Sequence, residues 1–260
     1  MCGRYTLATP LDDLVEVFDV GHVVFDSWQP RFNVAPTQTV PVVIRGPDGL
    51  RRLGPMRWGL VPFWAKDPSI GNRMINARSE TVATKPAFRE AFKRRRCVVP
   101  MDGFYEWRAR AVDGSKQPLK IPFWIHRPDR RPFGVAGLWE RWRGGGKGGT
   151  DAAGAKDDGD ADVPLVTFTI LTTAASRWMT PLHDRMPAIF TDAEATAAWL
   201  DPEADADRLA DVLKPARGAF LEAWEVRRAV NRPAVDEADC VAPIPDGDRV
   251  PSGSASDGSG

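Results

Sequence analysis

Apolar residues recur at helical spacing in four short stretches of the 260-residue chain. The clearest begins after Thr9 and Pro10, a capping residue followed by a proline that suits the first helical turn. Its apolar face falls at i, i+3, i+4 and i+7 and comprises Leu11, Leu14, Val15 and Phe18. Three further helices are predicted over residues 86–94, 192–200 and 203–213. Helices therefore make up only a small part of the predicted structure.

Strand patterns account for most of the remaining order. Residues 40–44 and 50–57 flank the turn Gly46-Pro47-Asp48-Gly49, which predicts a hairpin. Five more strands are predicted over residues 97–99, 103–108, 121–126, 133–139 and 165–171. Because these strands do not alternate regularly with helices, the pattern disfavours a doubly wound parallel sheet. We expect an α+β fold, with a mostly antiparallel curved sheet or open barrel and a few flanking helices.

Two segments lack the apolar residues that folding requires. Residues 143–163 consist mainly of Gly, Ala and Asp, and we interpret them as a disordered insertion between two strands. Residues 244–260 end in SGSASDGSG and are predicted to form a disordered tail. The chain is therefore predicted to fold as a single domain over residues 2–243.

Composition and charge narrow the possible functions. No run of about 18 apolar residues and no apolar leader is present, so we expect a cytoplasmic protein without a membrane partner. Lys and Arg total 35, as do Asp and Glu, but residues 1–143 hold 24 basic and only 14 acidic side chains. Such a basic region is compatible with a polyanionic partner.

Cys2, directly after the initiator Met1, is the first candidate for chemistry. Removal of Met1 would leave one residue with both an α-amine and a thiol, whose reference pKa values are ~7.7 and ~8.5. A 1,2-aminothiol condenses with an aldehyde to a Schiff base, which its thiol closes to a thiazolidine. It can also attack an amide as an N-terminal nucleophile. The competing interpretation is a small buried residue of the first strand.

The remaining Cys and the His residues form no recognisable site. Cys97 and Cys240 are isolated, so a disulfide framework is not expected. The chain has no Cys-x-x-Cys pair and its three His residues are scattered, so we expect neither a metal ion nor another cofactor.

Other candidate residues cluster in motifs rich in Asn, Arg, Trp and Pro. In chain order these motifs are MCGRYTL, RFNVAPTQ, WGLVPFWA, INARSET, CVVPMDGFYEW and LHDRMPAIF. Each alone has an ordinary structural explanation, because Trp is commonly buried and Arg commonly solvated. Together and in this order they resemble the SOS-response-associated peptidase (SRAP) family, whose members crosslink to abasic sites in single-stranded DNA. The resemblance extends from Cys2 to about residue 243 and omits only the insertion and the tail.

The resemblance implies four catalytic residues. Cys2 would attack the aldehyde of the abasic sugar, and Glu106 would move protons during ring opening and Schiff-base formation. We expect the neighbouring Phe104 and Trp107 to raise the pKa of Glu106 by desolvation. His183 would act as a proton shuttle. Asn76, whose amide donates and accepts, would orient the nucleophile or substrate.

The resemblance also implies DNA contacts and a DNA-damage function on the nucleoid, carried out by a monomer. Arginines would bind phosphates, and an aromatic pair would stack on bases. The implied DNA-binding residues are Arg4, Asn33, Phe63, Trp64, Arg78, Thr172 and Arg185. The family name itself raises an alternative, an N-terminal-nucleophile peptidase or amidohydrolase that uses only the Cys2 thiol. A non-covalent single-stranded-DNA binder is the third interpretation, but it leaves Cys2, Glu106 and His183 unexplained.

Overall fold

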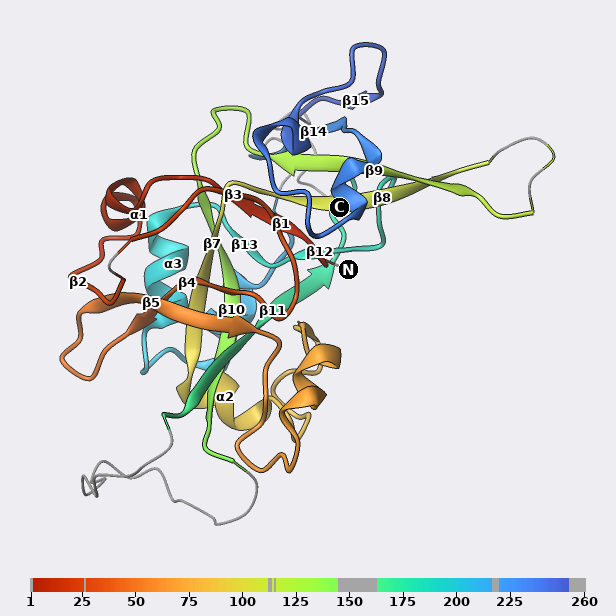
Figure 1. Cartoon of the computed structure of the whole chain (residues 1–260). Helices are drawn as coiled ribbons and strands as arrows, with labels where there is room; N and C mark the ends of the chain where they lie inside the picture. The colour runs from red at the N-terminus through yellow and green to blue at the C-terminus, as the bar shows by residue number, and fades with distance from the viewer. Residues whose placement is uncertain are drawn as a thin grey trace.

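The computed structural model describes residues 2–25, 27–111, 114, 116–144, 163–216 and 220–252 of the chain. Residues 145–162 of the predicted insertion and residues 253–260 of the predicted tail lie outside these ranges. The α-helices are α1 (Leu11–Val17), α2 (Arg89–Arg94), α3 (Ala193–Leu200) and α4 (Ala206–Val212). Short 3-10 helices are η1 (Pro68–Arg73), η3 (Arg228–Asn231) and η4 (Ala238–Val241). Most other elements are strands of two sheets (Figure 1).

The first sheet has six strands, all antiparallel to their neighbours. In spatial order they are β15 (Arg249–Val250), β14 (Glu222–Glu225), β9 (Leu119–His126), β8 (Gly103–Arg110), β1 (Tyr5–Leu7) and β3 (Arg31–Val34). Its longest pairing joins β8 to β9, with Glu106 opposite Phe123. We call this the six-stranded sheet.

The second sheet closes on itself. It contains β2 (His22–Val23), β4 (Thr39–Arg45), β5 (Arg51–Trp58), β6 (Asn76–Arg78), β7 (Arg96–Met101), β10 (Phe133–Trp142), β11 (Leu165–Ala174), β12 (Arg185–Pro187) and β13 (Ile189–Phe190). Antiparallel pairing runs from β5 through β4, β7 and β10 to β11. The parallel pairing of β11 with β5, through Phe168 and Trp58, completes a five-stranded barrel.

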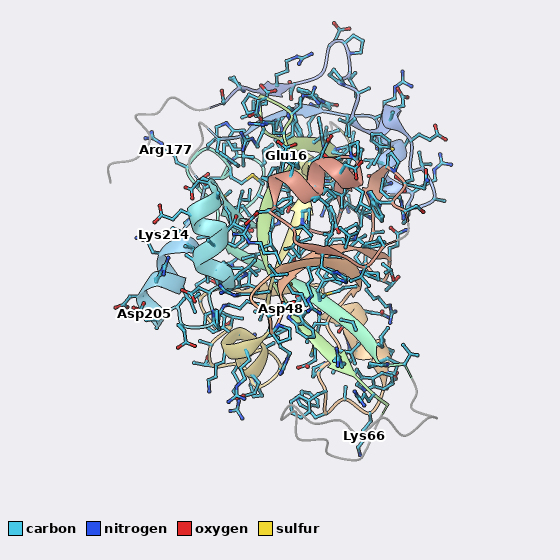
Figure 2. The ribbon with its side chains drawn as sticks, turned by 90° about the vertical axis from the view of Figure 1, so that its left-hand side faces the viewer. Glu16, Asp48, Lys66, Arg177, Asp205 and Lys214 are labelled. Atoms are coloured by element: carbon cyan, nitrogen blue, oxygen red, sulfur yellow. The ribbon has the colours of Figure 1, made fainter. Side chains whose placement is uncertain are left out.

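Two layers of buried side chains hold these sheets. The larger cluster includes residues of the barrel strands together with Phe104 and Phe123 of the six-stranded sheet. Tyr105 and Trp124, the alternate residues of β8 and β9, belong to a smaller cluster, because successive strand residues point to opposite faces. Charged side chains such as Glu16 project outward (Figure 2). Along the described parts of the chain, no helix has the length and apolar character needed to cross a membrane.

The α+β architecture and the 46–49 hairpin are confirmed, but the barrel is closed rather than open. The helix predicted from Asp192 is also confirmed, and the Asp192 side chain accepts a hydrogen bond from the Ala195 N–H at 2.8 Å. Strands β10 and β11 flank the predicted insertion.

Two local predictions were wrong. Thr9 does not cap α1, because its hydroxyl donates to Asp102 and Pro10 holds the cap position. The predicted tail begins too early, because residues 245–252 include β15, which pairs with β14. Ahead of that strand, Asp248 accepts from Arg110 at 2.9 Å.

Candidate active site

Cys2 lies where the barrel meets the six-stranded sheet. Tyr5 of β1 pairs with Phe104 of β8, and the Tyr105 N–H donates to the Arg4 carbonyl at 3.0 Å. Continuing this register towards the N-terminus brings the first residues alongside Glu106. From the barrel, Asn76 of β6 donates its Nδ2 hydrogen to the Cys2 carbonyl at 2.7 Å. One element of each sheet therefore fixes the backbone next to the candidate nucleophile.

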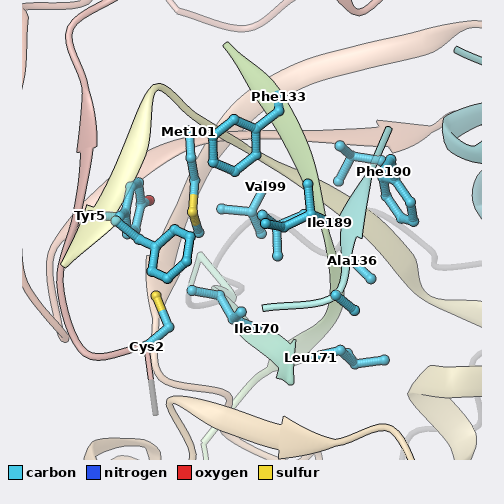
Figure 3. Packing of buried hydrophobic residues seen from close by; sticks show 14 of the residues in the cluster. Cys2, Tyr5, Val99, Met101, Phe133, Ala136, Ile170, Leu171, Ile189 and Phe190 are labelled. Atoms are coloured by element: carbon cyan, nitrogen blue, oxygen red, sulfur yellow. The ribbon is translucent and has the colours of Figure 1, made fainter. Parts of the chain in front are cut away.

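The Cys2 thiol is buried at the edge of the main core. Its residue is 0% exposed, and its sulfur points into the cluster that contains Tyr5 and Ile170 (Figure 3). Burial raises the pKa of the Cys2 thiol well above its ordinary value, and the negative charge of Glu106 raises it further. The thiol is therefore held mainly as S–H, with a carboxylate near enough to influence its proton.

Glu106 is a carboxyl group inside the protein, only 3% exposed. Phe104 and the cross-strand residue Phe123 belong to the main core cluster on the same face of the sheet. Burial raises the pKa of Glu106, whereas the positive charge of His183 lowers it. The expected direction is thus confirmed, but the expected role of Trp107 was wrong, because Trp107 packs against the smaller cluster on the opposite face.

His183 makes two polar contacts through one ring nitrogen, Nδ1. The Arg185 N–H donates to its Nδ1 at 2.9 Å, a bond that requires a lone pair on Nδ1 and so places the neutral ring's proton on Nε2. Asp184 Oδ1 lies 2.7 Å from the same nitrogen, a contact that is favourable when Nδ1 carries a hydrogen. The two contacts therefore call for different hydrogen positions on the ring.

The side of the site formed by β6, β11 and β12, here called the barrel flank, carries two arginines in different states. Arg185 binds Glu80 bidentately, with Nη1–Oε1 and Nη2–Oε2 distances of 2.6 and 3.0 Å, and donates to the Thr172 carbonyl at 2.5 Å. Arg185 also lowers the pKa of Glu80. Arg78 is exposed, and no carboxylate of the described residues pairs with it. Thr172 is 0% exposed, so the structure makes it a support for Arg185 rather than a surface contact.

The opposite side, here called the sheet flank, comprises the start of the chain, β3 and residues 227–236. Arg4 Nη1 donates to Asn33 Oδ1 at 2.8 Å and to the Val230 carbonyl at 2.9 Å. Asn33 is 0% exposed, and its Nδ2 donates to the carbonyls of Val230, Arg232 and Val235 at 3.0, 3.1 and 2.7 Å. The expected DNA contact of Asn33 is therefore corrected: its buried amide anchors residues 230–235.

A loop between β5 and η1 exposes the predicted aromatic pair. Phe63 and Trp64 are 51% and 50% exposed, unlike most large apolar side chains of the protein. Gly59 begins this loop with a φ of 120°, and a Cβ there would lie 2.6 Å from the Gly71 carbonyl oxygen. The loop is fixed at its base, because the Gly59 N–H donates to the Phe168 carbonyl at 2.8 Å. Two aromatic rings thus stand in solvent on an anchored loop.

The structure brings together the four predicted catalytic residues, but it separates the predicted DNA contacts into exposed and internal groups. Phe63, Trp64 and Arg78 are exposed. Arg4, Asn33, Thr172 and Arg185 hold internal partners. Sequence analysis missed Glu80, although it stands in the INARSET motif that contains Asn76 and Arg78. Among the side chains that the structure describes, no three His, Cys, Asp or Glu converge as a metal site would require.

The chain is similar to several known proteins. The sequence matches the family described as SOS response associated peptidase (SRAP) over residues 1–233. It is 40% identical over 236 residues to the abasic site processing protein YoqW of Bacillus subtilis, covering 90% of this chain and 95% of that protein. It is 30% identical over 275 residues to the abasic site processing protein HMCES of Pongo abelii, covering 94% of this chain and 76% of that protein. A crystal structure of a Bacteroides thetaiotaomicron protein superposes with a TM-score of 0.75 at 25% identity, covering 94% of this chain and 100% of that one.

Proposed function

This chain belongs to the SOS response associated peptidase (SRAP) family, and from that premise we propose that it processes abasic sites in DNA. The finer proposal is that it binds single-stranded DNA at an abasic site and crosslinks to the lesion through Cys2, after Met1 has been removed. The crosslink would shield the lesion during the response to DNA damage. No metal ion or organic cofactor takes part in the proposed chemistry.

The proposed reaction joins one aldehyde to one aminothiol and releases one water. The α-amine of Cys2 adds to C1′ of the ring-opened sugar, and loss of water from the adduct gives a Schiff base. The Cys2 sulfur then forms a bond to the same carbon while the thiol proton passes to the nitrogen, which closes the thiazolidine. No oxidant or reductant is required.

The polar residues around Cys2 supply the proton transfers of this sequence. Glu106, with a pKa raised by burial, can take a proton from the attacking group and return it to the departing water. His183, whose Nδ1 contacts Arg185 and Asp184, would use its Nε2 to pass a proton to the sugar oxygen during ring opening. Asn76 holds the Cys2 carbonyl and so fixes the direction from which the amine attacks.

The non-covalent part of binding is assigned to exposed groups. Phe63 and Trp64 would stack on bases, each stacking contact contributing roughly 1–3 kcal/mol without sequence preference. Arg78 would bind a phosphate. Arg185 would do so only by exchanging its bond to Glu80 for one to DNA.

The polar surroundings of Cys2 support this proposal more than any other observation, because two groups act on Cys2 and a third acts on one of them. Asn76 holds its carbonyl, the charge of Glu106 acts on its thiol, and His183 acts on Glu106. The other two cysteines are buried as well. The pKa of Cys97 is raised by burial alone among the described residues, and that of Cys240 mainly by burial, with neighbouring carboxylates raising it further.

The peptidase alternative requires a reactive thiolate. Cysteine nucleophiles are normally activated by surroundings that lower the thiol pKa. Burial and Glu106 act on Cys2 in the opposite direction. A mechanism in which the amine reacts first, and the sulfur adds to an already activated carbon, tolerates such a thiol better.

A denaturing gel of the protein incubated with single-stranded DNA containing one abasic site tests the proposal. We expect a DNA–protein species that survives denaturation with wild type and with Cys97→Ala and Cys240→Ala. We expect none with Cys2→Ala, which should still bind intact single strands. Loss of free aldehyde without any crosslink, or crosslinking by Cys2→Ala, would refute the proposed function.

A further inference from the structure

A turn formed by residues 227–232 lies against the start of the chain on the sheet flank. Arg4 donates to the carbonyls of Val230 and Asn231 at 2.9 and 3.3 Å. Trp107 Nε1 donates to Asn231 Oδ1 at 2.7 Å, and Asn33 holds the last carbonyl of the turn. Arg4 and Asn33 together donate four hydrogen bonds to backbone carbonyls of the turn. Arg4 is two residues from Cys2 along the chain, so the turn is anchored next to the candidate nucleophile.

The turn presents positive charge that the described residues do not neutralise. Arg228 and Arg232 are both exposed, and neither forms an ion pair with a described carboxylate. Arg227 differs, because its Nη1 lies 2.8 Å from Asp239 Oδ2. Of the two other carboxylates that follow the turn, Asp236 pairs with Arg31, and the exposed Glu237 forms no ion pair with a described residue.

We propose that Arg228 and Arg232 form a phosphate-binding site for the DNA strand whose abasic sugar reaches Cys2. The inference rests on the proposed function, because that function places a strand across the N-terminus. Such a strand continues on both sides of the lesion. Arg78 serves the barrel flank, and the 227–232 turn serves the sheet flank. The ligand class is a backbone phosphodiester, which arginine binds through paired, charge-assisted hydrogen bonds.

The hydrogen bonds of Arg4 to the turn contribute to this site in two ways. Arg4 holds neutral carbonyls rather than carboxylates, so its own positive charge is not cancelled. It thereby adds to the potential at the turn while it keeps the backbone of the turn fixed. A fixed turn loses less conformational freedom on binding than a flexible loop carrying the same arginines.

The test compares two double variants that remove the same charge from different places. Arg228→Ala/Arg232→Ala removes both arginines of the turn. Arg45→Ala/Arg94→Ala removes two exposed arginines that form no ion pair with a described carboxylate and that line a hollow of about 350 Å³ between the β4–β5 turn and α2. Equilibrium binding of lesion-free single-stranded DNA is measured against salt concentration for each. The crosslinking rate on abasic DNA is then measured against DNA concentration.

We expect the turn variant to bind more weakly, with its logarithmic salt slope reduced by about 1.4, the share of two single-strand phosphates. Its crosslinking should need more DNA for half-maximal rate but reach the wild-type maximum, because the turn does not touch the reacting atoms. The control variant should keep the wild-type slope. A wild-type slope in the turn variant, or an equal loss in the control, overturns the inference. Failure of wild type to crosslink would instead overturn the proposed function, and the binding data would still decide on the turn.

Discussion

The two flanks of the site each hold one immobilised arginine, but the partners differ. On the barrel flank Arg185 is paired with the carboxylate of Glu80, so its charge is largely cancelled. On the sheet flank Arg4 is held by carbonyls and an amide oxygen, so its charge remains. Identical side chains therefore give different potentials. The charge of Arg185 becomes available on the barrel flank only if its ion pair with Glu80 breaks. The charge of Arg4 on the sheet flank is available without any such change.

Glu106 lies between the flanks, and its replacement should have the largest effect. Glu106→Gln keeps the shape but cannot accept the proton, so crosslinking should slow by roughly 10²–10⁴-fold. Single-turnover gel kinetics measure this. An unchanged rate would show that Glu106 does not transfer protons in the crosslinking reaction.

The same variant has a stability signature with a defined sign. Burial raises the pKa of Glu106 in the folded protein. The contribution of Glu106 to the free energy of unfolding is therefore favourable at low pH and is lost as pH rises through that pKa. Glu106→Gln should therefore raise the melting temperature at neutral pH, and the difference should shrink on acidification. A variant that is less stable at neutral pH would contradict the assigned direction.

Asn33→Ala should break the sheet flank alone. It removes three hydrogen bonds to backbone carbonyls and leaves Arg4 without one partner, at a cost of roughly 1–3 kcal/mol for each buried group left unsatisfied. Denaturant unfolding measures the loss. Thr172→Val on the barrel flank is the matched control and should cost less, because the Thr172 carbonyl that Arg185 binds is retained. Equal losses would mean that the two flanks are anchored alike.

Glu80→Gln should have the smallest effect, and in the opposite direction. It removes the negative charge that competes with phosphate for Arg185, so binding of single-stranded DNA should tighten and its salt slope should steepen by up to about 0.7, one phosphate's share. Arg78→Ala should flatten the slope by a similar amount. Weaker binding by Glu80→Gln would mean that Glu80 orients Arg185 for DNA rather than competing with it.

Local sequence patterns were sufficient for the hairpin and for the helix that begins near Asp192. The candidate catalytic residues were chosen from the family resemblance instead, and their roles stay predictions. Local patterns could not predict barrel closure, because the parallel pairing of Trp58 with Phe168 joins distant segments without a local signal. The hydrogen bonds of Arg4 and Asn33 to the Val230 carbonyl could not be predicted for the same reason, since Val230 lies about two hundred residues away in the sequence. The orientation of Trp107, in contrast, could have been predicted from the sequence, because successive residues of a strand point to opposite faces and Trp107 follows Glu106.

The central claim is that Cys2 reacts as an aminothiol, through its amine as well as its sulfur. The most direct measurement is the crosslinking rate on abasic single-stranded DNA of a protein with an uncleavable N-terminal extension, whose retention is verified by intact mass. The Cys2 thiol is present in that protein, but its nitrogen is an amide. The account predicts no thiazolidine crosslink for the extended protein and a normal rate for one extended after Gly260. Crosslinking at the normal rate by the N-terminally extended protein would contradict it.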